Sequence, residues 1–248
     1  MDAYKEGEKK EISNALDTLC KATDAYGWAS AGIYSYWNYE TRKVLYVGLA
    51  VDLNERFKQH NGFYPGIDPN SCKKDFIDAY FKENEKLGIT IVVQSTLSQP
   101  SIRKVREQFE SLFEGKSSAQ EIGNDGVNEI QRLEGILIEA YRQSNGIFPA
   151  WNKMSGSING QQAVRLANYD ALRVIANHET HYLTARSTLR EIAANPTLER
   201  YENFLHAVRI MVPVMGAEKA FQMLNEQDPI GTFGHIQRDK YLEKKIVL

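Results

Sequence analysis

The chain has 248 residues, 42% hydrophobic and 25% charged, and no apolar run approaches the roughly 20 residues of a membrane span. Its net charge of −2, from 30 basic and 32 acidic residues, counts against a generally basic nucleic-acid-binding protein, although a local basic patch suffices to bind phosphates. The N-terminus lacks the apolar core of a secretory signal, and two cysteines without C-x-x-C spacing argue against a disulfide scaffold or zinc knuckle, so we expect a cytoplasmic protein.

The N-terminal part of the chain predicts a helix followed by a hairpin. Residues 8–24 have the apolar spacing of an amphipathic helix. Residues 29–37 and 43–50 are short runs rich in aromatic and β-branched residues, which is typical of strands. The polar stretch 38–42 between them predicts the turn of an antiparallel hairpin.

A short helix is predicted directly after the hairpin. It starts at Asp52, which has Glu55 three residues later in the pattern of a capping box, and it ends near His60, before Asn-Gly. An inserted loop and helix then occupy about residues 61–88, with the helix at 71–87.

The next part of the chain predicts a third strand and two helices. The strand covers residues 89–97, and one helix follows Pro100. Residues 115–126 are expected to be mobile, and a long helix is predicted from about Val127 to Gln143.

From about residue 161 the apolar spacing is almost entirely helical. The predicted fold is α+β: a small antiparallel sheet flanked by helices, with an appended, mostly α-helical C-terminal unit. We expect three parts: an N-terminal helical extension at 1–28, a sheet domain at 29–155 and a helical domain at 156–248.

The predicted hairpin brings two tyrosines and a glycine to one face. A three-residue loop at 39–41 would place Tyr34 directly opposite Tyr46, with Gly48 beside them, because side chains of a strand alternate between its faces. A glycine there allows a ligand to approach closely. The alternative is that the aromatic pair serves packing alone.

Arg56 and His60 lie four residues apart and therefore share a face of the short helix. A guanidinium can grip a phosphate with paired donors, and an imidazole can carry a proton near neutral pH. The alternative is an ordinary solvated helix surface.

Glu134 is placed unusually, because it falls within the apolar stripe of the long helix, one turn from Ile130 and Ile138. A carboxylate on the core side of a helix is costly unless it is paired or binds a metal. A buried salt bridge is the alternative.

These residues together resemble the GIY-YIG nuclease family over roughly residues 29–155. The resemblance rests on GIY at 32–34, YVG at 46–48, and the residues Tyr34, Tyr46, Arg56, His60, Glu134 and Asn152. YVG replaces YIG, the insertion at 61–88 is long, and the gap from Glu134 to Asn152 is longer than a compact member needs.

The resemblance implies a metal-dependent endonuclease that hydrolyses phosphodiester bonds in DNA. Glu134 would hold one Mg²⁺ or Mn²⁺, and Arg56 would stabilise charge on the phosphate. Tyr34 would activate or position the attacking water, Tyr46 would bind phosphate or water, and His60 would help by accepting a proton. Asparagine 152 would shape the pocket by hydrogen bonding.

Further contacts to the nucleic acid are expected from Gly48 and from six basic residues: Lys58, Lys73, Lys74, Arg103, Lys104 and Arg106. Solvated surface is the alternative for the basic residues. The C-terminal unit is expected to select the target or to form homodimer contacts. Three biological roles are compatible with this expectation: restriction or defence, repair, and the movement of mobile elements. RNA is an alternative substrate. A non-catalytic protein that binds nucleic acid or another protein is the alternative function.

Overall fold

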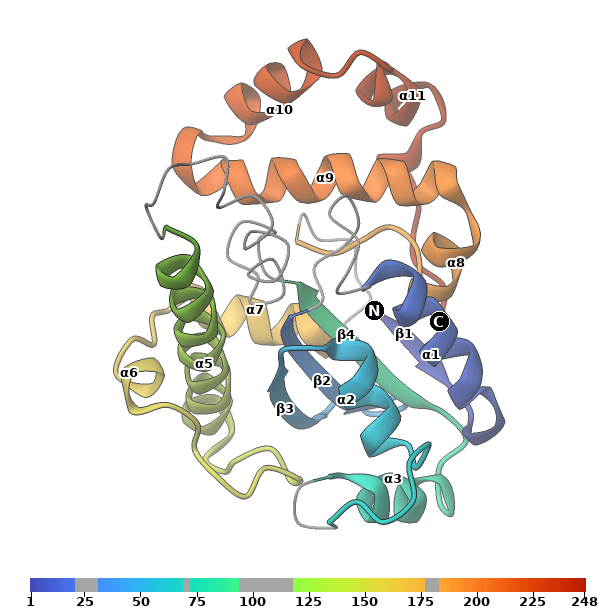
Figure 1. Cartoon of the computed structure of the whole chain (residues 1–248), viewed down its shortest axis with the longest axis vertical. Coiled ribbons are helices and arrows are strands. Elements are labelled where there is room, and N and C mark those ends of the chain that lie inside the picture. The colour runs from blue at the N-terminus through green and yellow to red at the C-terminus, as the bar shows by residue number, and fades with distance from the viewer. Residues whose placement is uncertain (21–30, 69–71, 94–117, 177–182) are drawn as a thin grey trace. The chain divides into compact units, whose positions relative to one another are not determined.

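The computed structural model describes residues 1–20, 31–68, 72–93, 118–176 and 183–248 (Figure 1). Its internal contacts divide the chain into two compact units. We call Ala3–Asn177 the sheet unit, and Met1–Asp2 together with His178–Leu248 the helical unit. The predicted α+β class is confirmed. Among the described helices, none has the length and apolar character needed to cross a membrane.

The sheet has four strands in the order β1-β4-β2-β3 (Figure 1). The strands are β1 (Asp2–Tyr4), β2 (Gly32–Asn38), β3 (Val44–Ala50) and β4 (Leu87–Val93). The second strand pairs antiparallel with both β3 and β4. The third strand therefore forms one edge of the sheet.

The hairpin register differs from the prediction by two residues. Gly48 lies opposite Tyr34, and Tyr46 lies opposite Tyr36, so the predicted pairing of Tyr34 with Tyr46 is wrong. One extra residue lies in the turn, which the bond from Asn38 N–H to the carbonyl of Lys43 closes, and a bulge after Tyr36 adds another. A shift of two residues keeps every side chain on its original face.

Different helices cover the two faces of the sheet. The face with Tyr34 and Tyr36 receives α2 (Leu53–His60) through His60. On the opposite face, the hydroxyl of Thr90 donates a hydrogen bond of 2.6 Å to a carbonyl of α7 (Ala167–Ala176). The site described below is therefore built on the α2 face.

Helix α2 has the predicted N-cap and ends before Gly62 as predicted, but only half of the capping box forms, since the Glu55 carboxylate accepts from Tyr64 and Lys58. The Asp52 side chain accepts a hydrogen bond of 2.9 Å from the Glu55 N–H, and Gly62 after the helix has a φ of 79°. Helix α1 (Lys9–Leu19) packs on α2, where Ser13 donates to Asn54.

Two other helices have bounds that differ from the prediction. Helix α3 (Lys74–Phe81) is shorter, because β4 already starts at Leu87 and Gly88 lies within that strand. Helix α5 (Ser118–Asn145) begins at Ser118 instead of near Val127. The helix predicted after Pro100 lies outside the described residues.

The division by packing falls later than the predicted boundary near residue 155. The short helix α6 (Ile158–Gln161) and α7 belong to the sheet unit and pack against α5. Gly160 lies so close to α5 that a Cβ on it would come within 2.3 Å of the Arg132 carbonyl oxygen.

The described part of the helical unit is mostly helical, as its apolar spacing predicts, although α11 (Thr232–Arg238) has no predicted stripe. The helices before it are α8 (Leu189–Ala194), α9 (Pro196–Met215) and α10 (Ala217–Glu226). Its core joins α9 to α11 and to the segment that follows, through Tyr201, Leu205, Ile236 and Tyr241.

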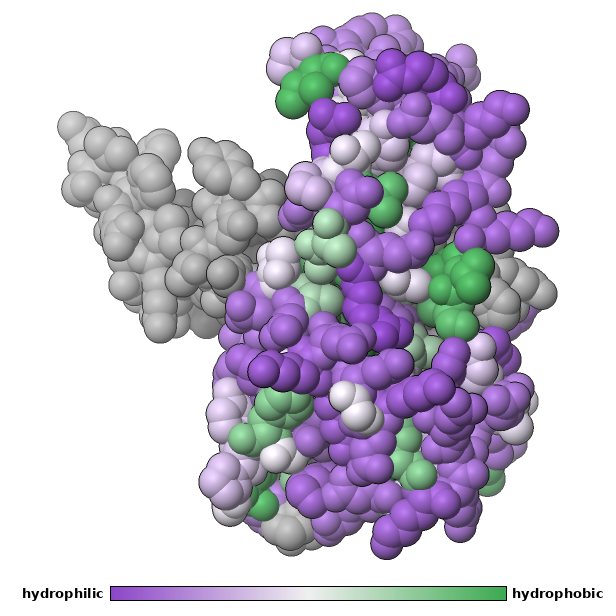
Figure 2. Space-filling view, turned by 90° about the vertical axis from the view of Figure 1, so that its right-hand side faces the viewer, coloured by the Kyte–Doolittle hydropathy of each residue, from purple (hydrophilic) through white to green (hydrophobic). Residues whose placement is uncertain are grey.

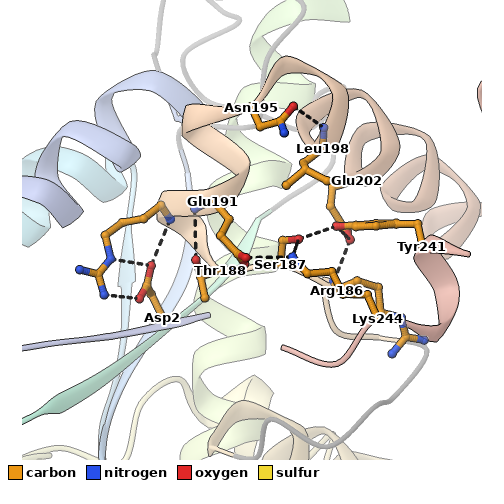
Figure 3. Close-up of polar contacts among 11 residues, drawn as sticks. Asp2, Arg186, Ser187, Thr188, Glu191, Asn195, Leu198, Glu202, Tyr241 and Lys244 are labelled. Carbon is orange, nitrogen blue, oxygen red and sulfur yellow. Dashed lines mark hydrogen bonds and ion pairs between the residues drawn. The ribbon is translucent and has the colours of Figure 1, made fainter. Parts of the chain in front are cut away.

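The helical unit also holds a buried carboxylate, Glu202, which is fully shielded from solvent (Figure 3). Its carboxylate accepts hydrogen bonds from the Arg186 N–H at 2.8 Å, from the Tyr241 hydroxyl at 2.9 Å and from the Arg209 guanidinium at 3.1 Å. Such a set offsets the cost of burying the charge only while every partner is present.

Figure 2 shows a mainly hydrophilic face on which hydrophobic residues form separate small groups. Scattered exposed apolar residues are normal on a folded protein. The most exposed large ones in the described chain include Met154, Leu166 and Val247.

Replacing Glu202 with Gln should lower the free energy of unfolding by about 3 kcal/mol, because the Arg209 guanidinium then stays largely buried without its counter-charge. Urea denaturation followed by circular dichroism measures the effect. Arg238→Gln is the control, since its ion pair with Asp239 is largely exposed, and it should leave the midpoint nearly unchanged. Equal midpoints for both variants would contradict the role of Glu202.

Replacing Gly88 with Ala should destabilise the protein by about 3 kcal/mol, because a Cβ there would lie 2.2 Å from two atoms of the Trp37 indole. Thermal denaturation measures the loss. Gly7→Ala is the control, since a Cβ at that position would contact nothing within 4 Å. A Gly88→Ala protein as stable as Gly7→Ala would mean that Trp37 moves aside freely.

Candidate functional site

Two phenol groups converge above Gly48 in the centre of the hairpin. A Cβ at Gly48 would lie 2.8 Å from both the Tyr34 and the Tyr46 oxygen, and 2.6 Å from a ring carbon of Tyr46. The two rings have centroids 5.6 Å apart. Glycine is therefore the residue that allows the two hydroxyls to come together over the strand.

His60, the last residue of α2, is buried beside these phenols. Its Nε2 lies 2.6 Å from the Tyr34 oxygen, and its Nδ1 accepts a hydrogen bond of 2.9 Å from the Lys73 backbone N–H. A backbone N–H can only donate, so Nδ1 carries no hydrogen and the neutral ring carries its hydrogen on Nε2. His60 thus donates to the Tyr34 oxygen.

The ring of His60 is held in its neutral form. Burial lowers its pKa to about 3, and the nearby charges of Arg56 and Lys73 act in the same direction. Because Nδ1 already accepts a hydrogen bond and Nε2 already carries a hydrogen, the expected role of His60 as a proton acceptor does not fit this arrangement.

Both phenols keep their protons at neutral pH. Burial raises the pKa of Tyr34 well above its usual value, the neighbouring Tyr46 adds to this, and Arg56 opposes it. Burial also raises the pKa of Tyr46, with a smaller contribution from the negative charge of Glu134. The charges of Arg56 and Glu134 therefore both reach the pair of phenols.

Arg56 lies one helical turn before His60 on α2, as the sequence predicts. Within the described part of the chain, no carboxylate forms an ion pair with its guanidinium. Its charge is therefore available to an anion at the phenols.

Glu134 reaches the free edge of β3 from α5. Its carboxylate accepts a hydrogen bond from the Leu49 N–H, which favours the charged form, although burial is the larger effect and raises its pKa. The predicted alternative, a buried salt bridge, does not occur among the described residues. A half-buried carboxylate beside Tyr46 is thus left without a cation.

Asn152 also lies on the free edge of β3, and not against the phenols. Its side chain donates to the Val47 carbonyl at 2.8 Å and accepts from the Val47 N–H at 3.0 Å. The Trp151 N–H bonds the carbonyl of Leu45 at 2.8 Å. Asn152 therefore fixes the strand that carries Tyr46 and Gly48.

The basic residues expected to contact nucleic acid separate into three groups. Lys58 pairs with Glu55 at 3.1 Å and Lys74 with Asp78 at 2.5 Å, both on helix surfaces. Lys73 lies at the phenols, with its Nζ 4.9 Å from the Tyr46 ring centroid. The others, Arg103, Lys104 and Arg106, lie outside the described residues.

One residue of the site, Asn61, has no signal in the sequence beyond its place at the end of α2. It accepts a hydrogen bond of 2.9 Å from Tyr4 of β1 and donates one of 3.2 Å to the Tyr36 hydroxyl. Asn61 thereby ties the end of the helix that carries His60 to two strands.

Glu134 is the residue of this site that could serve as a ligand for a hard divalent ion. Among the described residues, no group of three or more His, Cys, Asp or Glu side chains could hold a metal. Glu134 supplies one carboxylate, and Mg²⁺ is commonly held by one or two carboxylates together with waters and substrate phosphates.

The ring of His60 should not titrate near neutral pH. Heteronuclear NMR of the imidazole should show a hydrogen on Nε2 and constant shifts from about pH 8 to pH 5, whereas an ordinary histidine titrates near 6.5. A midpoint near 6.5 would show that the ring is accessible to solvent.

The same shift makes stability depend on pH. The unfolded ring binds a proton near pH 6.5 but the folded ring only near 3, so the free energy of unfolding falls as the pH drops between these values. From about pH 6.5 to 5 the loss from His60 should be roughly 2 kcal/mol, measured by denaturation against a His60→Gln control.

No protein-family model matches the chain, and neither a curated protein nor a solved structure matches it. Its function is therefore inferred from the chemistry of its own side chains.

Proposed function

We propose that this protein is a metal-dependent endonuclease that hydrolyses phosphodiester bonds in DNA, as the resemblance of residues 29–155 to GIY-YIG nucleases implies. The observation that supports it most strongly is the convergence of Tyr34 and Tyr46 over Gly48. The charges of Arg56 and Glu134, for which the described part of the chain supplies no ion-pair partner, act on these two hydroxyls. Each of these side chains carries a group that phosphoryl hydrolysis requires.

Arg56 binds the phosphate in this proposal. Its guanidinium stays charged at any relevant pH and can donate two parallel hydrogen bonds to phosphate oxygens. No carboxylate of the described chain competes for it. Charge that develops on the phosphate in the transition state is stabilised by donors already in place.

Tyr34 orients the attacking water. Because His60 donates to the Tyr34 oxygen, the phenol's own hydrogen points away from His60. The same hydrogen bond stabilises the phenolate if Tyr34 releases its proton, and Arg56 lowers the pKa of Tyr34 in the same sense. His60 thus assists Tyr34 as a donor rather than as a base.

Glu134 is the residue that would hold Mg²⁺ or Mn²⁺, since carboxylate oxygens are the ligands these ions prefer. The ion, when bound, supplies positive charge to the phosphate and to the leaving oxygen. The Leu49 N–H orients the carboxylate, and Tyr46 lies close enough to bind a phosphate oxygen or a water next to it.

Cleavage assays with plasmid DNA, single-stranded DNA and RNA, with Mg²⁺ or with chelator, test the proposal. Glu134→Ala and Tyr34→Phe should each lower the rate by at least about 100-fold, because one removes the metal ligand and the other the hydroxyl at the water. Binding of Mn²⁺, followed by electron paramagnetic resonance, should also be lost in Glu134→Ala.

Two matched variants serve as controls. Tyr36→Phe removes a buried phenol hydroxyl from the same face of the same strand, where it accepts a bond from Asn61. Glu139→Gln alters a carboxylate of α5 that binds Arg142 instead. Both should keep most of the activity. Cleavage that persists with chelator, or Glu134→Ala as active as wild type, would contradict the metal site at Glu134. Absence of metal-dependent cleavage of every substrate would favour a non-catalytic binding protein.

A further inference from the structure

Lys73 is a largely buried lysine for which the proposed reaction has no role. It is the residue before α3 and is only 7% exposed. Lysine is almost never buried to this degree unless it is paired. Within the described part of the chain, no carboxylate forms an ion pair with it.

The position of Lys73 is fixed from two sides. Its backbone N–H donates to His60 Nδ1 at 2.9 Å. Its Nζ lies 4.9 Å from the ring centroid of Tyr46 and 5.6 Å from that of Phe76. The ammonium is therefore held against the phenol at the centre of the site, where its side-chain stem is buried and its charge faces two aromatic rings.

A second lysine adds positive charge at the same place. Burial, and then the charge of Lys153, lower the pKa of Lys73. Lys153 directly follows Asn152, whose side chain is bonded to Val47 of β3. Two neighbouring cations that repel each other are stabilised by a bound anion between or beside them.

Arg56 and Lys73 come from different elements and both lie near His60, whose pKa responds to each charge. The phenol of Tyr46 is close to both. Arg56 can bind one phosphodiester with its own paired donors, and Lys73 adds a second cation from another element, with no carboxylate partner among the described residues.

We propose that Lys73 binds a second phosphate of the substrate, next to the one that Arg56 holds, so that the site takes a strand with two consecutive phosphates. The inference rests on the proposed function, because it names the substrate class of that same site. A polynucleotide fits this site, and a compound with an isolated phosphodiester does not fill it.

Short thymidine oligonucleotides test the proposal by NMR titration in the presence of chelator. The probes are d(TpT), with one phosphate, and d(TpTpT), with two, added to Glu134→Ala protein so that no cleavage occurs. The two-phosphate probe should bind about tenfold more tightly, because it gains one charged contact. Replacing either of its phosphates with a neutral methylphosphonate should remove this gain.

Lys73→Met should abolish the tenfold difference and leave binding of d(TpT) unchanged, since Met keeps the aliphatic packing and loses the charge. Lys73→Arg should restore the difference. Lys74→Gln is the matched control, because Lys74 is the neighbouring residue and pairs with Asp78 on the surface. Unchanged amide NMR signals of the helical unit and an unchanged thermal midpoint report that each variant is folded.

Several results would overturn the proposal. Equal loss for both probes in Lys73→Met would place Lys73 at the same phosphate as Arg56. No loss for either probe, or no binding of either probe to the parent protein, would make Lys73 structural. Binding needs no hydrolysis, so an intact difference without any DNA cleavage would overturn the nuclease proposal alone, and cleavage without the difference would overturn the second phosphate alone.

Discussion

The site depends on how the free edge of β3 is closed. Leu45, Val47 and Leu49 direct backbone groups away from β2, and these groups bond in turn to the Trp151 N–H, to the Asn152 side chain and to the Glu134 carboxylate. An open edge would otherwise invite pairing with another chain. One of these hydrogen bonds, to the Leu49 N–H, holds the Glu134 carboxylate of α5 near Tyr46. The contacts that cover the edge of β3 therefore also place a residue of the site.

Strand alternation predicts the face of each tyrosine correctly, but not the register. Period-two spacing is insensitive to a shift of two residues, and the shift arises from one added residue in the turn and one in the bulge. Gly88 gives a second example, because a glycine after a helical pattern indicates a helix end. Its actual place under the Trp37 indole follows from packing between strands that are distant in sequence.

The sequence predicts which residue types gather at the site, but not how their hydrogen bonds are arranged. The spacing of Arg56 and His60 and the place of Glu134 on an apolar stripe indicate which groups converge. The hydrogen on His60 Nε2 does not follow from spacing, since it is set by the backbone of Lys73, which a loop brings to it. Composition likewise treats Lys58, Lys73 and Lys74 alike. The carboxylate partners of Lys58 and Lys74 lie three and four residues away on the same helix and follow from local spacing, whereas the contact of Lys73 with Tyr46 follows from tertiary packing.

The helical unit contains both ends of the described chain, since Met1–Asp2 pack with His178–Leu248. Asp2 is bound by the backbone and guanidinium of Arg190, at 3.0 Å for each of two contacts (Figure 3). Residues 1–2 precede the sheet unit in the chain, and their partners in the helical unit follow it. The sheet unit, which is continuous from Ala3 to Asn177, can form on the ribosome beforehand, so the order of synthesis favours completing the candidate site before the helical unit closes.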